Sequence, residues 1–478
     1  MSLVLPLSAE TDRGWLQLEV FPVFSYAQTR TADAIELNRY FEHPQFFNFE
    51  IELSAGGFEY VMDLGLFRDP FNYFENTAYS NIPMIGKNGL TLSGYFVNTP
   101  AEGYLAFQND LFDISVGRRK WAFGYGEYNM ALGRQAPYYD GLWLSFNPPD
   151  PRGGGRWHYT FLFAGDEAKM TSEIWDRHKT EPYWKDFSSD LRWFMAHKLS
   201  YQGESWQFGI SENMVISEVD PGFMMLMPIW HNLSRGSLND SIDISFEKRF
   251  ESWRLYGDAY MDDFTLAHET KGNPNAWGFY AGADIRLGPA EPFGGVVFDP
   301  YEHLKSEADS SFSDGIILSL QGALTSRYLY NRTEAHPFGK FVMFRRIPTG
   351  FVESIIGFPY GNDVIMAKAS LEWSGRRFLA RGGLSLLLMG EDNNVKLYST
   401  GDYALSNILP GDPLQNTVQS SSNWLYSGIR EINLIIDPEL YFALTDSLSA
   451  YGGIDCRLVL NDPSQNKFSF NLGAYWEF

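Results

Sequence analysis

The last residues of the chain alternate strictly between apolar and polar positions. The apolar positions are Phe468, Phe470, Leu472, Ala474, Trp476 and Phe478, and the residues between them are polar, small or amphipathic. Such a period of two predicts a β-strand with one face in an apolar medium and the other near water. The pattern continues up to the aromatic residue that ends the chain.

The same alternation recurs along the chain from Gly14 onwards. Phe47–Leu53 and Phe58–Leu66 alternate on either side of the tight Ser54–Gly57 turn, and Trp277–Leu287 repeats the pattern. Many of these candidate strands are roughly ten to thirteen residues long, which is the length of a tilted transmembrane strand and about twice that of a globular one. The pattern therefore predicts an all-β fold, a single transmembrane antiparallel β-barrel.

The connections between the candidate strands alternate between long and short. Counting back from the C-terminus, Gly390–Ser421 and Asn331–Asn362 are long, whereas Thr445–Ser447 and Ser374–Arg376 are tight turns. Bacterial barrels have long extracellular loops, short periplasmic turns and an even number of strands. The predicted barrel has the same arrangement.

One segment decides the strand count. Separate strands within Gly89–Asn109 give about 19 candidates, whereas one long, bulged strand there gives about 18 and restores the loop rhythm upstream. Two inner connections, Asn147–Gly155 and Gly288–Asp314, remain longer than periplasmic turns usually are. We therefore predict 18 strands.

Composition agrees with a membrane barrel and excludes other classes. Aromatic residues make up 17% of the chain, which suits a barrel with two aromatic girdles. No run of apolar residues is long enough for a transmembrane helix. The net charge of −22 argues against nucleic-acid binding, and the single cysteine, Cys456, excludes a disulfide framework.

The first residues do not fit the strand pattern. Met1–Asp12 holds a short apolar piece but lacks a basic n-region and a full apolar core. We interpret it as a truncated signal peptide or as an ordinary N-terminal extension. The predicted organisation is an N-terminal extension over residues 1–13 and one barrel domain over 14–478.

Signatures of catalysis are missing from the sequence. It contains no His-Glu-x-x-His, no Gly-x-Ser-x-Gly and no P-loop, and its eight histidines show no metal-ligand spacing. We therefore predict a protein that is not an enzyme and has no metal or cofactor.

Two segments combine arginines with aromatic residues and glycines. Asp113–Pro149 surrounds Gly124-Tyr-Gly126, and a second segment runs from Arg345-Arg346 to Gly357-Phe-Pro-Tyr-Gly361-Asn-Asp363. Guanidinium groups bind carboxylates and hydroxyls, and aromatic rings stack on sugars. The candidate sugar contacts are Arg118, Arg119, Trp121, Tyr125, Tyr128, Arg134, Arg345 and Arg346. Alternatively, these arginines brace the lumen against its acidic residues.

These two segments carry a resemblance. The Gly117-Arg118 strand, with its glycine-rich loop and Leu142-Trp-Leu-Ser145, resembles the capsule assembly Wzi family, as does Gly357–Asp363. The resemblance implies an 18-stranded barrel in the bacterial outer membrane that binds capsular polysaccharide at the cell surface. Unlike that family, this chain shows no N-terminal helical segment that would plug the lumen.

Three functions follow from these patterns. The first is surface polysaccharide binding without catalysis, with membrane lipid and polysaccharide as partners. The second is a passive porin, in which the lumen-lining charges set solute preference. Those charges are Arg254, Asp258, Arg286 and Arg457. The third is a soluble, secreted all-β lectin or hydrolase.

Overall fold

The computed structural model describes the barrel wall and several segments inside it. The described residues are 13–30, 33, 35–36, 39–40, 45–68, 73–74, 76–82, 95–97, 102–133, 138–166, 192–217, 238–263, 276–287, 315–330, 341–347, 350–375, 377–391, 393, 398–400, 428–445 and 447–477. Residues 1–12 of the predicted N-terminal extension and the inner connection 288–314 lie outside them, whereas Arg13, the last residue of that extension, begins the first strand.

One antiparallel sheet of 22 strands forms the wall among these residues. Its strands are β1 (Arg13–Val20), β2 (Val23–Ala27), β3 (Phe47–Ala55), β4 (Phe58–Arg68), β5 (Ala78–Ser80), β6 (Tyr95–Val97), β7 (Glu102–Gln108), β8 (Phe112–Arg119), β9 (Tyr139–Phe146), β10 (Gly155–Gly165), β11 (Arg192–Gly203), β12 (Trp206–Ser217), β13 (Leu238–Arg249), β14 (Trp253–Asp263), β15 (Ala276–Leu287), β16 (Gly315–Thr325), β19 (Val364–Gly375), β20 (Phe378–Gly390), β22 (Ile429–Ile436), β23 (Glu439–Ala443), β24 (Leu448–Val459) and β25 (Lys467–Glu477).

These 22 strands correspond to 18 strands that span the wall. Three of the 18 are each broken into two segments, and β5 is an extra segment paired with β2. The broken strands are β1–β2, β6–β7 and β22–β23. Pro22 and Pro438 lie in two of the breaks, where a residue without an N–H interrupts the ladder. The break between β6 and β7 is the irregularity predicted within Gly89–Asn109.

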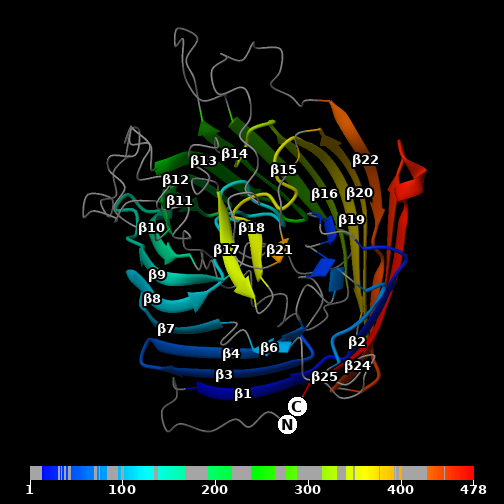
Figure 1. The fold of residues 1–478 in the computed structure, drawn as a ribbon. Helices are drawn as coiled ribbons and strands as arrows, with labels where there is room; N and C mark the ends of the chain where they lie inside the picture. The colour runs from blue at the N-terminus through cyan, green and yellow to red at the C-terminus, as the bar shows by residue number, and fades with distance from the viewer. Residues whose placement is uncertain are drawn as a thin grey trace, which may run out of the picture.

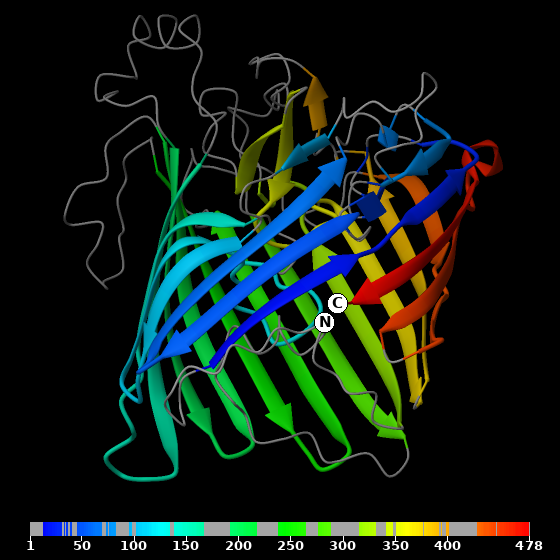
Figure 2. The same ribbon diagram turned by 90° about the horizontal axis from the view of Figure 1, so that it is seen from below.

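The sheet closes on itself, since β25 pairs with both β1 and β2. Figures 1 and 2 show the resulting barrel from two directions, with its strands inclined to the barrel axis. The predicted closed, 18-stranded antiparallel barrel is thereby confirmed. Among the described residues, no helix has the length and apolar character needed to cross a membrane.

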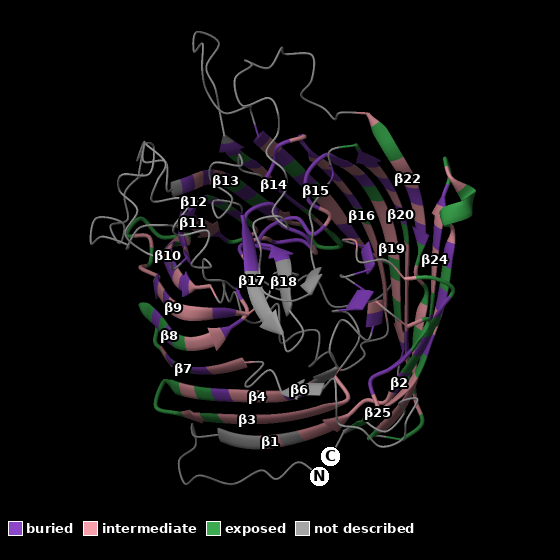
Figure 3. Cartoon of the chain, in the orientation of Figure 1, coloured by how far each residue is buried: buried purple, intermediate pink, exposed green. Residues whose placement is uncertain are grey.

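Burial along the wall strands is the reverse of that in a soluble sheet. On β8, the apolar residues Phe112, Ile114 and Val116 are 44%, 41% and 55% exposed, whereas Asp113 and Ser115 are buried. The polar face thus turns into the lumen and the apolar face outwards, as a membrane barrel requires. Figure 3 shows buried and exposed residues alternating along the wall.

A second sheet lies within the ring of wall strands. It consists of β17 (Val342–Ile347), β18 (Gly350–Ile355) and β21 (Tyr398–Thr400), which pair antiparallel. Figure 1 shows it inside the ring of wall strands, and Figure 2 shows that it lies towards one mouth of the barrel. On that side, η5 (Pro463–Gln465) is a short 3-10 turn between β24 and β25.

Candidate functional site

The connection from β8 to β9 folds into the lumen instead of away from the barrel. We call its described part, residues 120–133, the plug segment. Trp121, Met130 and Leu132 have no exposed surface, and Phe123 has 4%. The plug segment therefore belongs to the core of the molecule.

Local hydrogen bonds shape the plug segment into a compact loop. The amide of Phe123 donates to the carbonyl of Leu132 over 3.1 Å, and the side-chain oxygen of Asn129 accepts from the amides of Ala131 and Leu132. A Cβ at Gly126 would lie 2.3 Å from the ring of Tyr256, so only glycine lets the loop approach the wall this closely.

Side chains from four wall strands hold the plug segment. Lys198 on β11 donates to the carbonyl of Phe123, and Asp258 on β14 accepts from the amide of Met130 over 2.7 Å. Glu127 of the plug segment accepts from Lys368 on β19 over 2.6 Å and from Gln321 on β16 over 3.0 Å. The plug segment is therefore attached to the wall at both ends and in its middle.

Tyr330 joins the plug segment to the second predicted motif. Its hydroxyl donates to the carbonyl of Met130 over 2.6 Å and accepts from the amide of Phe358 over 2.9 Å. A Cβ at Gly357 would lie 2.0 Å from that same Met130 carbonyl oxygen. The two glycine-containing motifs, far apart in sequence, thus lie against each other in the lumen.

The plug segment completes an apolar core that bridges the lumen. Trp121 stacks on Trp143 of β9, with ring centroids 5.5 Å apart, and Tyr128 packs on Phe358 at 5.6 Å. The same cluster reaches wall residues on opposite sides of the lumen. These are Trp143, Leu162, Phe194 and Val215 on β9–β12 and Met366, Leu387 and Ile435 on β19–β22. A bridge of buried side chains therefore crosses the barrel interior.

A residue of the connection between β2 and β3 also reaches the wall. Arg457 on β24 donates to Asp33 over 2.8 Å, to Glu431 over 2.8 Å and to Asn433 over 2.7 Å. Burial raises the pKa of Asp33, but the charges of Arg457 and Lys467 outweigh it and lower this pKa to about 2. Asp33 is therefore a carboxylate at all physiological pH values.

Glu127 is likewise held as a carboxylate. Burial raises its pKa, but the charge of Lys368 and the hydrogen bonds from Lys368 and Gln321 outweigh burial and lower it. The pKa values of the neighbouring Tyr125 and Tyr128 are raised by burial, so both keep their hydroxyl protons. The tip of the plug segment carries one negative charge, opposite one lysine.

The predicted contacts Arg118 and Arg119 lie on opposite faces of the wall. Arg118 faces outwards and forms a two-pronged ion pair with Asp140, whereas Arg119 is buried on the inner face, 3.9 Å above the ring of Tyr104. Gly117 before them has φ 134°, and a Cβ there would lie 2.2 Å from the carbonyl oxygen of Gly103. The structure does not bring these two arginines together.

The other predicted contacts fall into two groups. Trp121, Tyr125 and Tyr128 are part of the plug segment and buried, so their rings pack against protein. Arg345 and Arg346 lie on β17, opposite Val352 and Phe351 of β18, but their side chains, like all of Arg134, lie outside the described residues.

The four charges predicted to line the lumen all lie on the inner face of their strands. Arg254 pairs with Asp284 over 2.6 Å, and Asp258 and Arg457 hold the inward segments as described above. Arg286 follows Asp284 by two residues and shares its face. They are engaged with other lumen side chains or lie beside them.

Apart from Asp258, the residues that hold the plug segment were not singled out from the sequence. Lys198 and Lys368 occupy polar positions of alternating strands, so the alternation itself could have identified them as inward-facing cations. No sequence signal marks Tyr330, whose φ of 64° and bond to Met130 depend on tertiary contacts. Among the described residues, no group of three or more His, Cys, Asp or Glu side chains could hold a metal ion.

Comparisons with known proteins identify the fold. No protein-family model matches the sequence, and no curated protein matches it either. Wzi, an outer-membrane protein involved in group 1 capsule assembly in Escherichia coli and described as a carbohydrate-binding β-barrel, superposes with a TM-score of 0.54 at 10% identity, covering 95% of this chain and 83% of its own.

Two porins superpose less well. OccK11 of Pseudomonas aeruginosa has a TM-score of 0.45 at 8% identity and covers 97% of this chain and 96% of its own. An anion-selective porin from Comamonas acidovorans has a TM-score of 0.36 at 11% identity and covers 98% and 100%. The superposition on Wzi shows that the chain has the fold of the bacterial outer-membrane β-barrels.

Proposed function

We propose that this protein is a non-catalytic barrel of the bacterial outer membrane that binds surface polysaccharide, such as capsule, and is not an open channel. The observation that carries the proposal is the anchored plug segment. Wall strands β11, β14, β16 and β19 hold it through side chains, and its core bridges the lumen. A filled lumen favours a role at the cell surface over the passage of solutes.

The sheet of β17, β18 and β21 offers a place for the polysaccharide. Val342 and Met343 at the start of β17 and Ile355 at the end of β18 are buried in the lumen core. One end of the sheet is therefore packed against the core. Arg345 and Arg346 follow on β17. Guanidinium groups there would bind carboxylates or hydroxyls of a sugar chain. The description of Wzi as carbohydrate-binding agrees with this proposal.

Within this proposal, seven of the eight predicted contacts have a role, and Arg118, which faces outwards in its pair with Asp140, has none. Arg134, Arg345 and Arg346 are the candidates for touching the polysaccharide. Trp121, Tyr125 and Tyr128 are buried, so we assign them the task of holding the plug segment in place. Arg119 supports the inner wall through its stacking on Tyr104.

The test is titration of the purified protein in detergent with isolated capsular polysaccharide. We expect the double variant Arg345→Gln/Arg346→Gln to bind at least about 10-fold more weakly, the equivalent of ~1.4 kcal/mol. The matched control is Arg152→Gln/Arg377→Gln, which removes two exposed arginines from inner turns at the opposite end of the barrel. Unchanged binding by the first variant, or equal losses in both, would contradict the proposal.

Conductance in a planar bilayer tests the closed lumen. Insertion without steady current agrees with the proposal. Steady open-channel steps would favour the porin alternative, in which Arg254, Asp258, Arg286 and Arg457 set the preference for solutes.

A further inference from the structure

One buried carboxylate beside the plug segment has no hydrogen bond. Asp243 lies on the inner face of β13 with none of its surface exposed. Among the residues that the structure describes, neither of its carboxylate oxygens has a hydrogen-bond partner. Its neighbours in register, Ser211 on β12 and Tyr260 on β14, leave both oxygens unbonded. Burying a carboxylate in this way costs free energy, so an arrangement that gives Asp243 a cation is favoured.

A lysine lies within reach of this carboxylate, on the same inner face. Lys198 on β11 is in register with Ser211, and Ser211 is in register with Asp243, so the three residues form one row across β11–β13. Neighbours in such a row have Cβ atoms about 5 Å apart, which places the Cβ atoms of Lys198 and Asp243 about 10 Å apart. A lysine side chain of about 5 Å, an aspartate side chain of about 2.5 Å and a hydrogen bond of about 3 Å span this distance.

Gly209 on β12 gives the lysine a path towards β13. A Cβ at Gly209 would lie 2.7 Å from Cε of Lys198 and 3.2 Å from Oγ of Ser245, which is two residues after Asp243 on β13. The side chain of Lys198 therefore already extends over β12, through space that a side chain at position 209 would occupy. Only a change of rotamer at its end separates the ammonium group from the carboxylate.

In the closed barrel, Lys198 binds the plug segment instead. Its ammonium group donates to the backbone carbonyl of Phe123 and lies 5.2 Å from the ring centroid of Phe123 and 4.9 Å from that of Tyr125. Within the described part of the chain, this carbonyl is its only hydrogen-bond acceptor. An ammonium group binds a carboxylate more strongly than a neutral carbonyl. The plug segment and Asp243 therefore compete for one lysine.

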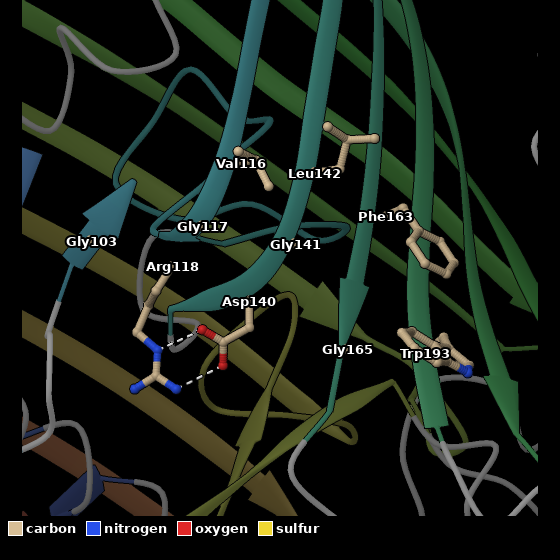
Figure 4. Close-up of a pocket in the computed structure, with 10 residues that line it drawn as sticks. All are labelled: Gly103, Val116, Gly117, Arg118, Asp140, Gly141, Leu142, Phe163, Gly165 and Trp193. Carbon is tan, nitrogen blue, oxygen red and sulfur yellow. Dashed lines mark hydrogen bonds and ion pairs between the residues drawn. The ribbon is translucent and has the colours of Figure 1, made fainter. Parts of the chain in front are cut away.

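The base of the plug connection is held independently of the plug segment. Arg118 near the end of β8 and Asp140 near the start of β9 form two hydrogen bonds, of 2.6 and 2.7 Å, on the outer face of the wall (Figure 4). Next to them, Gly117 and Gly141 are in register in the same pair of strands. The connection leaves and rejoins the wall at these strand ends. Release of the plug segment therefore requires no change in the wall.

We propose that the plug segment is a releasable closure of the lumen and that Lys198 changes partner when it is released. In the closed state, the ammonium group donates to the carbonyl of Phe123. In the released state, the same group donates to Asp243, and water hydrates the carbonyl. Release also breaks the contacts of Glu127 and Tyr330, and the new ion pair offsets part of that loss, so the released form is a minor state. This inference does not depend on polysaccharide binding.

Hydrogen exchange of peptides from residues 120–133 in the full-length protein in detergent tests this inference. Asp243→Asn removes the competing partner, so the plug segment should open less often and its exchange should slow at least about 10-fold. Asp243→Ser, which continues the serines at positions 241 and 245, should have the same effect if the asparagine variant does not fold. Glu439→Gln is the matched control, because it neutralises a carboxylate on β23 that accepts from Tyr451, and exchange should stay at the wild-type rate.

Lys198→Met separates the change of partner from a general effect of the charge at position 243. It should accelerate exchange of residues 120–133, and adding Asp243→Asn should then slow exchange at least about threefold less than it does in the wild-type chain. Heat-modifiable mobility in gels verifies that each variant is a folded barrel. Exchange in Asp243→Asn at or above the wild-type rate would overturn the proposal. Equal slowing by Asp243→Asn with and without Lys198 would overturn it as well.

Discussion

Tyr330→Phe removes one oxygen atom and should loosen the plug segment. The hydroxyl of Tyr330 is the shared partner of the Met130 carbonyl and the Phe358 amide, at 2.6 and 2.9 Å. All three residues are buried, with at most 1% of their surface exposed. The phenylalanine ring keeps the same shape, so the substitution tests these two hydrogen bonds rather than the packing.

The expected magnitude follows from the two groups left without a partner. A buried backbone group that loses its only partner costs about 1–3 kcal/mol. With partial relaxation, the sum for the Met130 carbonyl and the Phe358 amide is about 3 kcal/mol. Since ~1.4 kcal/mol is a factor of ten, the plug segment should open about 100-fold more often. Hydrogen exchange of peptides from residues 120–133 should accelerate by this factor.

Tyr451→Phe is the matched control for this experiment. It removes a tyrosine hydroxyl that donates to Glu439 over 3.2 Å on the wall, away from the contacts of the plug segment described above. Exchange of residues 120–133 should stay at the wild-type rate in this variant. Equal exchange rates of residues 120–133 in Tyr330→Phe and Tyr451→Phe would refute the conclusion that Tyr330 holds the plug segment in place.

Three further predictions concern charge and lipid. Lys368→Met should lower the midpoint of thermal unfolding, because the partly exposed Glu127 loses its counter-ion at a cost of about 1–2 kcal/mol. Adding Glu127→Gln should restore most of the loss. Because the pKa of Asp33 is lowered from 3.8 to about 2, the contribution of its carboxylate to the stability of the fold should be complete above pH 3.8 and disappear as the pH falls through 2. The Asp33→Asn variant should lack this acid step in denaturation curves. Leu472→Arg places a charge on the lipid face of β25 and should cost about 2–4 kcal/mol in denaturant titrations in vesicles, whereas Leu472→Phe should be neutral.

The sequence predicted the wall of the barrel because the wall obeys a local rule. A strand in a membrane alternates, so Phe468 to Trp476 and Phe112 to Val116 show their orientation without reference to any distant residue. The sequence also indicated one break in the ladder of strand hydrogen bonds, since the irregular segment within Gly89–Asn109 contains the two separate strands β6 and β7. These features depend on neighbouring residues only.

The filling of the lumen could not be predicted in the same way. Trp121, Tyr125 and Tyr128 have the composition of a sugar-binding loop, and the same composition serves an apolar core once the loop folds inwards. The direction of that fold is fixed by Lys198 and Lys368, which lie 75 and 241 residues from their partners in the plug segment. No local period reports contacts over such distances.

The location of the plug contacts bears on how the barrel is assembled. The side-chain contacts of residues 120–133 lie on strands between β7 and β19 and on the connections among them, an uninterrupted arc of the wall. The plug segment can therefore dock on an open, curved sheet before β25 meets β1 and β2. A barrel assembled in this order would close around an interior that is already filled, and no wide pore would form at any stage of its insertion.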